Sequence, residues 1–482
     1  MLFNSIEYLI FLPLVFLLYW FGFDRFIKKS KYQLQLQNAF VVVSSYVFYG
    51  WWDWRFLFLI AFTSLCSWGS GILIGKTKSK KRAKMWMWLN IILNIGILAT
   101  FKYYDFFVTE FAQLFHISMD GLLLKVVLPV GISFYTFQAL SYSIDIYRGK
   151  IEPTKDVIAF FAFISFFPQL VAGPIERATN LLPQFLKKRE FDYDTAVDGM
   201  RQILWGLFKK IVVADNCATY VNDVFGWPHS GSENLIAAIF FTFQIYCDFS
   251  GYSDIAIGTA KLFGVQLRQN FKVPYFSRDI AEFWRRWHIS LTTWFRDYVY
   301  IPFGGSRVRK ALVIRNTFIV FLLSGFWHGA NWTFIVWGAY HAVLFLPLIL
   351  TGKNRKYTNQ VAERRVLPTL KETGQMLSTF VLVTIGWVIF RSPGIPSAIS
   401  HLRVIFVPET YSGLYKIFTR WEMLPIVILL VVEWLQRNKE HGLQELDKFI
   451  SSRWLRCFLY GFVFVVIIFF RVNYQQFIYF QF

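Results

Sequence analysis

His328 lies deep in apolar sequence, at a place where a histidine can do acid–base chemistry. The apolar runs 318–323 and 334–337 enclose it, and Trp327 and Trp332 flank it. Desolvation keeps an imidazole neutral, and a general base needs that neutral state to take a proton from a hydroxyl nucleophile. A core histidine that is hydrogen-bonded to a neighbouring helix would show the same pattern. The residues themselves leave both interpretations open.

Small and polar neighbours favour the catalytic interpretation of His328. Gly325 and Gly329 permit close approach of a backbone or a substrate, and Asn331 offers amide donors to a developing oxyanion. We therefore expect Trp327 and Asn331 to contact substrate beside this histidine.

His288 is the second candidate, within the segment 282–297. If this segment is one helix, its spacing places Trp284, Arg285 and His288 on one side. An arginine can bind an anionic group such as a phosphate or a pantetheine-linked nucleotide, so this side would bind a charged donor. An interfacial amphipathic helix with snorkelling arginines and an aromatic belt is the alternative interpretation.

Polar side chains interrupt another apolar stretch between residues 246 and 254. Asp248 and Ser250 would form the wall of a polar cavity, or they would serve helix–helix hydrogen bonds. Asp248 and Asp254 are turned by about 240° on a straight helix and need not share a site. Gly251 offers a point at which the helix would break.

Metal chemistry is not indicated by the spacing of potential ligands. No His-x-x-x-His or Cys-x-x-Cys pair occurs, and no carboxylate stands at ligand spacing from His288 or His328. His341 would lie about 220° from His328 around a continuous helix, so we interpret it as structural. We expect most of the four scattered cysteines to be small buried hydrophobes, and we do not expect a disulfide framework.

The elements that must position these residues are membrane helices. Hydrophobic residues make up 55% of the 482 residues and charged residues 17%, whereas soluble domains carry about 25% charged residues. Apolar runs recur from residues 9–23 to residues 461–470, and several approach the length that crosses a bilayer as a helix. We predict an all-α polytopic membrane protein with roughly 11–13 transmembrane or re-entrant helices.

The formal charge of +20 is arranged as in a membrane protein and not as in a nucleic-acid-binding protein. Basic residues gather in short blocks between apolar runs, at 28–31, 76–84 and 353–371. This is the pattern of cytoplasmic loops beside anionic lipid, so we expect a bilayer and no nucleic acid as partner. Four successive spans then place the N-terminus outside. The first span lacks the features of a cleavable signal peptide and is expected to stay as an anchor.

We predict one membrane domain over residues 1–482. Within it, residues 1–120 form peripheral N-terminal spans, residues 125–345 form the catalytic core, and residues 346–482 hold a basic loop and C-terminal spans. The core is distinguished by five polar clusters within apolar sequence, which favour a cavity. No internal repeat is evident, and this speaks against an inverted-repeat transporter.

Four short segments together resemble the membrane-bound O-acyltransferase (MBOAT) family, in its bacterial alginate O-acetyltransferase membrane-subunit type. The resemblance extends over essentially the whole chain. The segments are FWRRWHISL at 283–291, WFRDY at 294–298, FGG at 303–305 and FWHGANWT at 326–333.

The resemblance implies a fold that encloses a central tunnel, with His328 as the catalytic histidine and His288 as the second motif residue beside it. It implies transfer of an acetyl or other short acyl group from a cytoplasmic thioester such as acetyl-CoA, with no permanently bound cofactor. The acyl group would cross the bacterial inner membrane for O-acetylation of an exported polysaccharide or cell-wall glycan. A periplasmic acetyltransferase or acyl acceptor protein commonly completes the transfer.

Three other functions remain as alternatives. D-alanyl transfer to a teichoic acid-type acceptor uses a related histidine motif in the same family. A polysaccharide or lipid-linked sugar transporter would need two related halves with paired broken helices. A purely structural scaffold would leave the buried polar clusters unexplained.

Overall fold

The protein is helical throughout its described parts. The computed structural model describes residues 1–23, 26, 30–119, 121–171, 173–226, 229–407, 411, 415, 420–472, 475 and 477–478. No strand occurs within these ranges, so the predicted all-α class is confirmed. The basic block predicted at 28–31 falls largely outside them, because residues 27–29 are not described.

Long apolar helices identify a multi-pass membrane protein. Within the described ranges, six helices are long and apolar enough to cross a membrane, judged by length and composition. Two shorter apolar helices cover Ile6–Gly22 and Met423–Leu435. The six longer ones are Arg55–Lys76, Lys80–Lys102, Gly231–Leu262, Lys310–His328, Trp332–Leu350 and Leu370–Arg391.

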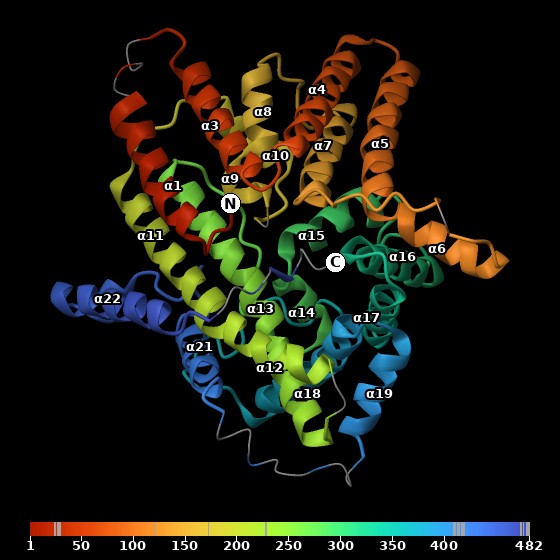
Figure 1. Ribbon diagram of the computed structural model, residues 1–482, viewed down its shortest axis with the longest axis vertical. Helices are drawn as coiled ribbons and strands as arrows, with labels where there is room; N and C mark the ends of the chain where they lie inside the picture. The colour runs from red at the N-terminus through yellow and green to blue at the C-terminus, as the bar shows by residue number, and fades with distance from the viewer. Residues whose placement is uncertain are drawn as a thin grey trace. The chain divides into compact units, whose positions relative to one another are not determined.

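The chain forms two compact units, of which the first comprises residues 1–200 and 256–268. Here α4 packs against α5 and α7, and α8 packs against α3 and α10 (Figure 1). Asn90 on α5 links this helix to α4 and α7, because its side chain accepts from Ser67 Oγ at 3.0 Å and donates to Ser143 Oγ at 2.9 Å. Such interhelical hydrogen bonds hold helices together in lipid. The elements are α1 Ile6–Leu17, η1 Leu18–Phe23, α3 Gln33–Gly50, α4 Arg55–Lys76, α5 Lys80–Lys102, α6 Tyr104–Phe115, α7 Ile132–Tyr147, α8 Val157–Ser165, α9 Phe167–Leu170 and α10 Ala178–Phe185.

The second unit comprises residues 201–255 and 269–482 and contains both candidate histidines. Two helices, α11 Tyr193–Leu207 and α13 Gly231–Leu262, contribute residues to each unit. The remaining elements are η2 Phe208–Ala214, α12 Asp215–Gly226, η3 Pro274–Phe276, α14 Ile280–Arg286, α15 Ile289–Phe295, η4 Arg296–Tyr300, α16 Lys310–His328, α17 Trp332–Leu350, α18 Leu370–Arg391, α19 Ile395–Ile405, α21 Met423–Leu435, η6 Leu446–Lys448 and α22 Arg453–Phe469.

The helices α16 and α17 form a close hairpin in the second unit (Figure 1). Glycine makes this approach possible, because a Cβ on Gly325 would clash with the carbonyl oxygen of Phe334. A Cβ on Gly338 would likewise clash with the carbonyl oxygen of Phe321. Gly325 therefore serves contact between two backbones, which is one of the two uses that its sequence context suggested.

The helix α13 continues through Gly251 without a break. Its buried acidic residues pair with two adjacent lysines of the π-helical turn η2. Lys209 Nζ lies 2.5 Å from Asp254, and Lys210 Nζ lies 2.6 Å from Asp248. A buried charge is retained at low energy only when it is paired, so these contacts explain how carboxylates are accommodated in apolar sequence.

Candidate active site

His288 and His328 border one small cavity of about 60 Å³. The first comes from the junction of α14 and α15, and the second is the last residue of α16. Both side chains are almost fully buried. The wall of the cavity is otherwise largely aromatic and aliphatic, with Thr292 and Ser324 as its other polar side chains among the described residues. The lining residues are Trp284, Trp287, His288, Leu291, Thr292, Phe295, Val320, Phe321, Ser324 and His328.

Aromatic rings enclose His328. Its imidazole stands edge-on to Trp327 at 5.0 Å, to Trp337 at 5.2 Å and to Phe390 at 5.3 Å between ring centroids. These rings come from α16, α17 and α18, so three helices fix the plane of the imidazole.

The segment 282–297 is not the continuous helix that its spacing predicted. The helix α14 ends at Arg286, and His288 adopts the left-handed conformation with φ 43° and ψ 53°. A neighbouring segment stabilises the break, because Ile289 N–H donates to the carbonyl of Asn270 at 2.8 Å. Lys272 N–H in turn donates to the carbonyl of Arg286 at 2.9 Å. Tertiary hydrogen bonds thus replace helical ones at this position.

The break directs His288 into the cavity beside Trp284. The imidazole stands edge-on to Phe249 at 4.6 Å and to Trp327 at 5.8 Å between ring centroids. Its Nδ1 lies 3.0 Å from Oδ1 of Asn270. Burial lowers the pKa of His288 to about 3, so its ring is neutral at physiological pH.

Arg285, the predicted anion-binding residue, is turned to a loop and does not line the cavity. Its guanidinium donates to the carbonyl of Asn354 at 2.8 Å and to that of Tyr357 at 2.5 Å. Two further arginines bind the same loop, because Arg278 and Arg286 both donate to the carbonyl of Asn359. Glu282 lies between these two arginines and pairs with each of them. We call Arg278, Glu282, Arg285 and Arg286 the arginine staple.

Asn331 and Trp327 occupy different positions relative to the two histidines. Asn331 caps α17, since its Oδ1 accepts from Thr333 N–H at 2.9 Å and its Nδ2 donates to the carbonyl of Pro393 at 3.0 Å. Trp327 lies against both imidazoles, at 5.8 Å from His288 and 5.0 Å from His328. The structure therefore brings Trp327 to the candidate site and uses Asn331 to begin a helix.

Asp248 and Ser250 are buried on α13 and are not among the residues that line the cavity. Asp248 pairs with Lys210 and also accepts from the backbone N–H of Ile478 at 2.7 Å. Lys210 bonds Asp215 as well, at 2.7 Å. The predicted contact of Asp248 and Ser250 with substrate stays a prediction.

His341 lies closer to the candidate site than its spacing suggested. The rotation of about 220° assumes one continuous helix, whereas α16 ends at His328 and α17 begins at Trp332. His341 packs edge-on against Trp337 at 5.1 Å and Trp284 at 5.0 Å, and both of those rings border His328 or the cavity.

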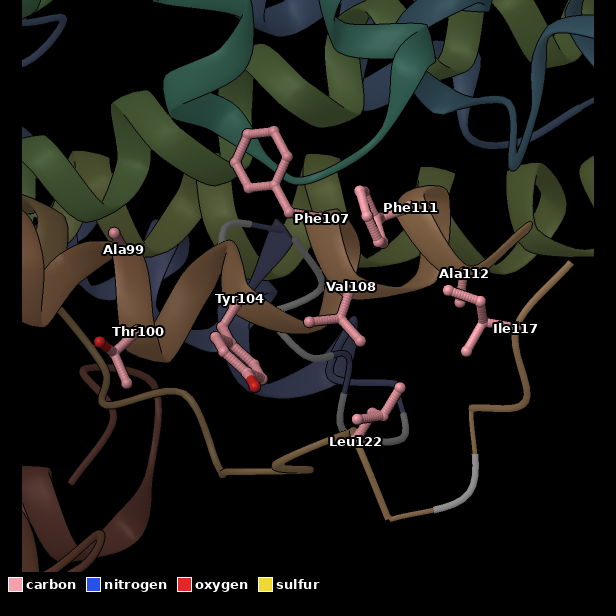
Figure 2. A pocket seen from close by; sticks show the side chains of 9 residues that line it. All are labelled: Ala99, Thr100, Tyr104, Phe107, Val108, Phe111, Ala112, Ile117 and Leu122. Atoms are coloured by element: carbon pink, nitrogen blue, oxygen red, sulfur yellow. The ribbon is translucent and has the colours of Figure 1, made fainter. Parts of the chain in front are cut away.

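A larger pocket of about 560 Å³ lies in the first unit and offers no comparable chemistry. It runs along α6 and the end of α5, and Figure 2 shows Tyr104 and Val108 on the side of α6 that faces Leu122. Among the described residues of its wall there is no histidine or carboxylate, so its size does not indicate a catalytic role. The lining residues are Ala99, Thr100, Tyr104, Phe107, Val108, Phe111, Ala112, Ile117 and Leu122.

Sequence reasoning did not identify Asn270, Phe249 or Phe390 as part of the site. Asn270 stands on an irregular segment between α13 and η3, where no periodicity marks it. Phe249 and Phe390 are single aromatic residues in helices that are rich in them. Because each reaches the site by tertiary packing, no local signal could have singled it out.

Comparison with known proteins places these features in a family. The model of the membrane-bound O-acyltransferase family (MBOAT) matches residues 153–371, which include both cavity histidines. The chain is 39% identical over 406 residues to the probable alginate O-acetylase AlgI of Pseudomonas aeruginosa, covering 83% of this chain and 73% of that protein.

Two further relatives differ in the acceptor that their names state. The chain is 34% identical over 434 residues to the peptidoglycan O-acetyltransferase of Helicobacter pylori, covering 84% of this chain and 79% of that protein. It is 30% identical over 276 residues to the teichoic acid D-alanyltransferase of Bacillus subtilis, covering 54% of this chain and 68% of that protein. Given the extent of these matches, the chain belongs to the membrane-bound O-acyltransferase family and is an O-acyltransferase.

Proposed function

We propose that the cavity between His288 and His328 transfers an acetyl group from a thioester to a hydroxyl, for O-acetylation of an exported polysaccharide or cell-wall glycan. The observation that carries this proposal is the position of both histidines at one cavity with a largely apolar wall. The names of the relatives support the acetyl group, because alginate and peptidoglycan O-acetylating proteins match over more than four fifths of the chain. The D-alanyltransferase match covers 54% of it.

His328 acts on the acceptor hydroxyl in this proposal. It removes the hydroxyl proton, or accepts its hydrogen bond, as the oxygen attacks the thioester carbonyl. A new C–O bond forms, the C–S bond breaks, and the proton released from the hydroxyl ends on the departing thiolate. His288 assists by binding the reacting groups. Trp327 lies against both imidazoles and restrains their position.

The charge distribution supports entry of the donor from the cytoplasm. Exposed basic residues stand before α16 and after α17, and Lys310 Nζ lies 3.5 Å from the carbonyl of Leu350 across the hairpin. Under the positive-inside rule this end of the hairpin faces the cytoplasm, and His328 lies at the other end of α16. A thioester such as acetyl-CoA would then deliver its acyl group while its charged portion stays inside. The exposed residues are Arg307, Arg309, Lys310, Lys353, Arg355 and Lys356.

The final steps lie outside the membrane in this proposal. The protein sits in the bacterial inner membrane with its N-terminus outside, and it passes the acyl group to a periplasmic acetyltransferase or acyl acceptor protein. That partner delivers the group to the glycan. No resident cofactor takes part, because the thioester is a substrate.

Replacing His328 by Ala tests the proposal. We expect acetyl transfer to fall by at least about 100-fold, because a positioned general base contributes about 10²–10⁴-fold. The measurement is transfer of labelled acetyl from acetyl-CoA to exported glycan in membranes that also contain the periplasmic proteins of the source cell.

The matched control is His116→Asn, at an exposed histidine that follows the last residue of α6 and has φ 53°. Asparagine tolerates this conformation, so the control should retain full activity. Retained acetyl transfer in the His328→Ala protein at equal membrane abundance would refute the role of His328. Incorporation of D-alanine in place of acetyl would assign the chain to the other branch of the family.

A further inference from the structure

Asn270 forms a buried anchor beside His288. Its side chain is fully buried, and its Oδ1 lies 3.0 Å from His288 Nδ1. The same oxygen accepts from Ser290 N–H at 3.3 Å and from Ser290 Oγ at 2.8 Å. Its Nδ2 donates to Ser253 Oγ at 3.2 Å, which ties the amide to α13.

These contacts determine which ring nitrogen of His288 carries the proton. A backbone N–H can only donate, so the atom of Asn270 that faces Ser290 N–H is the carbonyl oxygen and not the amide nitrogen. A carbonyl oxygen can only accept, so Nδ1 of His288 must be the protonated nitrogen in their contact. A neutral imidazole has a single N–H, and its lone pair is therefore on Nε2.

Asn270 also holds the backbone of His288 in place. Its carbonyl accepts from Ile289 N–H at 2.8 Å, directly after the left-handed residue. A non-glycine residue in that conformation is disfavoured by about 1–2 kcal/mol, so it needs such support. One residue thus fixes both the direction of the His288 side chain and its tautomer.

We propose that Asn270 is the positioning residue that presents Nε2 of His288 as a hydrogen-bond acceptor in the cavity. In this state His288 receives a hydrogen bond from the acceptor hydroxyl and orients its oxygen toward the thioester carbonyl. It does not donate to the oxyanion that forms there, because its single N–H is bound to Asn270. This role rests on the proposed acyl transfer, whereas the tautomer itself follows from the contacts alone.

The tautomer is measured without any assay of transfer. In protein labelled with ¹⁵N-histidine, protonated and unprotonated ring nitrogens give separate NMR resonances, and comparison with His288→Gln assigns those of His288. We expect a protonated Nδ1 and an unprotonated Nε2. The opposite assignment would overturn the proposal even if the protein proves to be an acetyltransferase. If Nδ1 is protonated and Nε2 is not, but the protein transfers no acetyl group, the proposed function is refuted and the assigned tautomer stands.

Variants of Asn270 and Ser290 separate positioning from general packing. Asn270→Leu removes the acceptor for Nδ1 and should lower the kcat of acetyl transfer by about 10–100-fold. Ser290→Ala removes a bond to the same Oδ1 but leaves the His288 contact, so its kcat should stay within about threefold of wild type. Equal losses in the two variants would contradict a specific role of Asn270.

Asn270→Asp keeps the accepting oxygen and gives a readout in pH. A carboxylate beside Nδ1 stabilises the imidazolium, so it raises the pKa of His288, whose ring is otherwise packed against Phe249, Phe271 and Trp327. The acid limb of the kcat/KM profile should therefore move to higher pH while activity at alkaline pH approaches wild type. An unshifted acid limb in Asn270→Asp would refute the coupling between residue 270 and His288. This test remains valid even if Asn270→Leu does not fold.

Discussion

The imidazoles of the cavity are held in two different ways. Rings of Trp327, Trp337 and Phe390 stand around His328 and fix its plane, whereas the amide of Asn270 holds His288 by a hydrogen bond. Ring packing restrains orientation but does not discriminate between the two nitrogens, while an amide oxygen does. The contact with Asn270 therefore fixes the tautomer of His288.

Protonation of His288 should make stability depend on pH. Burial lowers its pKa to about 3, whereas an unfolded histidine titrates near 6.5, so the unfolded state binds more protons between these values. Stability is then full above about pH 6.5 and falls as the pH decreases toward 3, by about 1.4 kcal/mol per pH unit. His288→Gln should remove this contribution.

The measurement is the thermal midpoint in detergent micelles between pH 7 and pH 5. Wild type should lose more stability than His288→Gln over this range, because other titrating groups are common to both proteins. Parallel curves for the two proteins would show that His288 is not buried in its neutral form.

Local sequence predicted the identity of the two histidines but not their surroundings. Both stand in recognisable motifs. Trp284 and Trp287 before His288 line the cavity, and Trp327 contacts both imidazoles, whereas Trp332 is exposed. Spacing on a continuous helix did not predict where Arg285 and His341 lie relative to the two cavity histidines. The reason is that the helix breaks at His288 and again between His328 and Trp332. Periodicity describes one helix at a time, and these positions are fixed by contacts between helices.

At the scale of elements, the hairpin of α16 and α17 determines the position of His328 relative to the rings around it. Backbone contact at Gly325 and Gly338 leaves no room for side chains between the helices. The rings of Trp337 on α17 and Phe390 on α18 can then reach the imidazole. The site therefore depends on helix spacing within fractions of an ångström.

Gly325→Ala should destabilise this hairpin. The added Cβ would meet the carbonyl oxygen of Phe334, and overpacking of this kind typically lowers stability by about 1–3 kcal/mol. Gly96→Ala is the matched control, because it also lies within a spanning helix and has nothing within 4 Å of the added Cβ. The thermal midpoint in micelles should fall for Gly325→Ala and stay equal or rise for Gly96→Ala. Equal midpoints would contradict close backbone packing at Gly325.

The class of these elements was predictable, while their ends were not. Apolar runs define helices in lipid irrespective of tertiary context, whereas the break suggested at Gly251 was wrong, because α13 continues past it. The break at His288 depends on hydrogen bonds with Asn270 and Lys272. The sequence of the segment 282–297 contains no pattern that predicts these bonds.

At the scale of the whole molecule, the basic blocks predict the direction of the spans that flank them. The blocks at 76–84 and 353–371 belong inside, and the aromatic turn at 51–54 belongs outside. A single reagent that does not cross membranes therefore tests the proposed orientation.

Cysteine labelling from outside the cell provides that test. Trp52→Cys should react in intact spheroplasts, because Trp52 is exposed at the turn before α4. Lys356→Cys should react only after permeabilisation, since it is exposed in the basic loop after α17. A variant with Cys457 replaced by Ser serves as background, because Cys457 is an exposed native thiol. The reverse labelling pattern would invert the proposed orientation and with it the side from which the donor enters.

The arginine staple has a consequence for how this protein can diverge from its relatives. Its arginines bind main-chain carbonyls of Asn354, Tyr357 and Asn359. Every residue type supplies such a carbonyl, but Asn359 and Gln360 also accept from these arginines through their side chains. The loop can therefore vary at Asn354, which supplies its carbonyl to Arg285, and is constrained at Asn359 and Gln360. Its path can be inherited while its chemical character changes at the first of these positions.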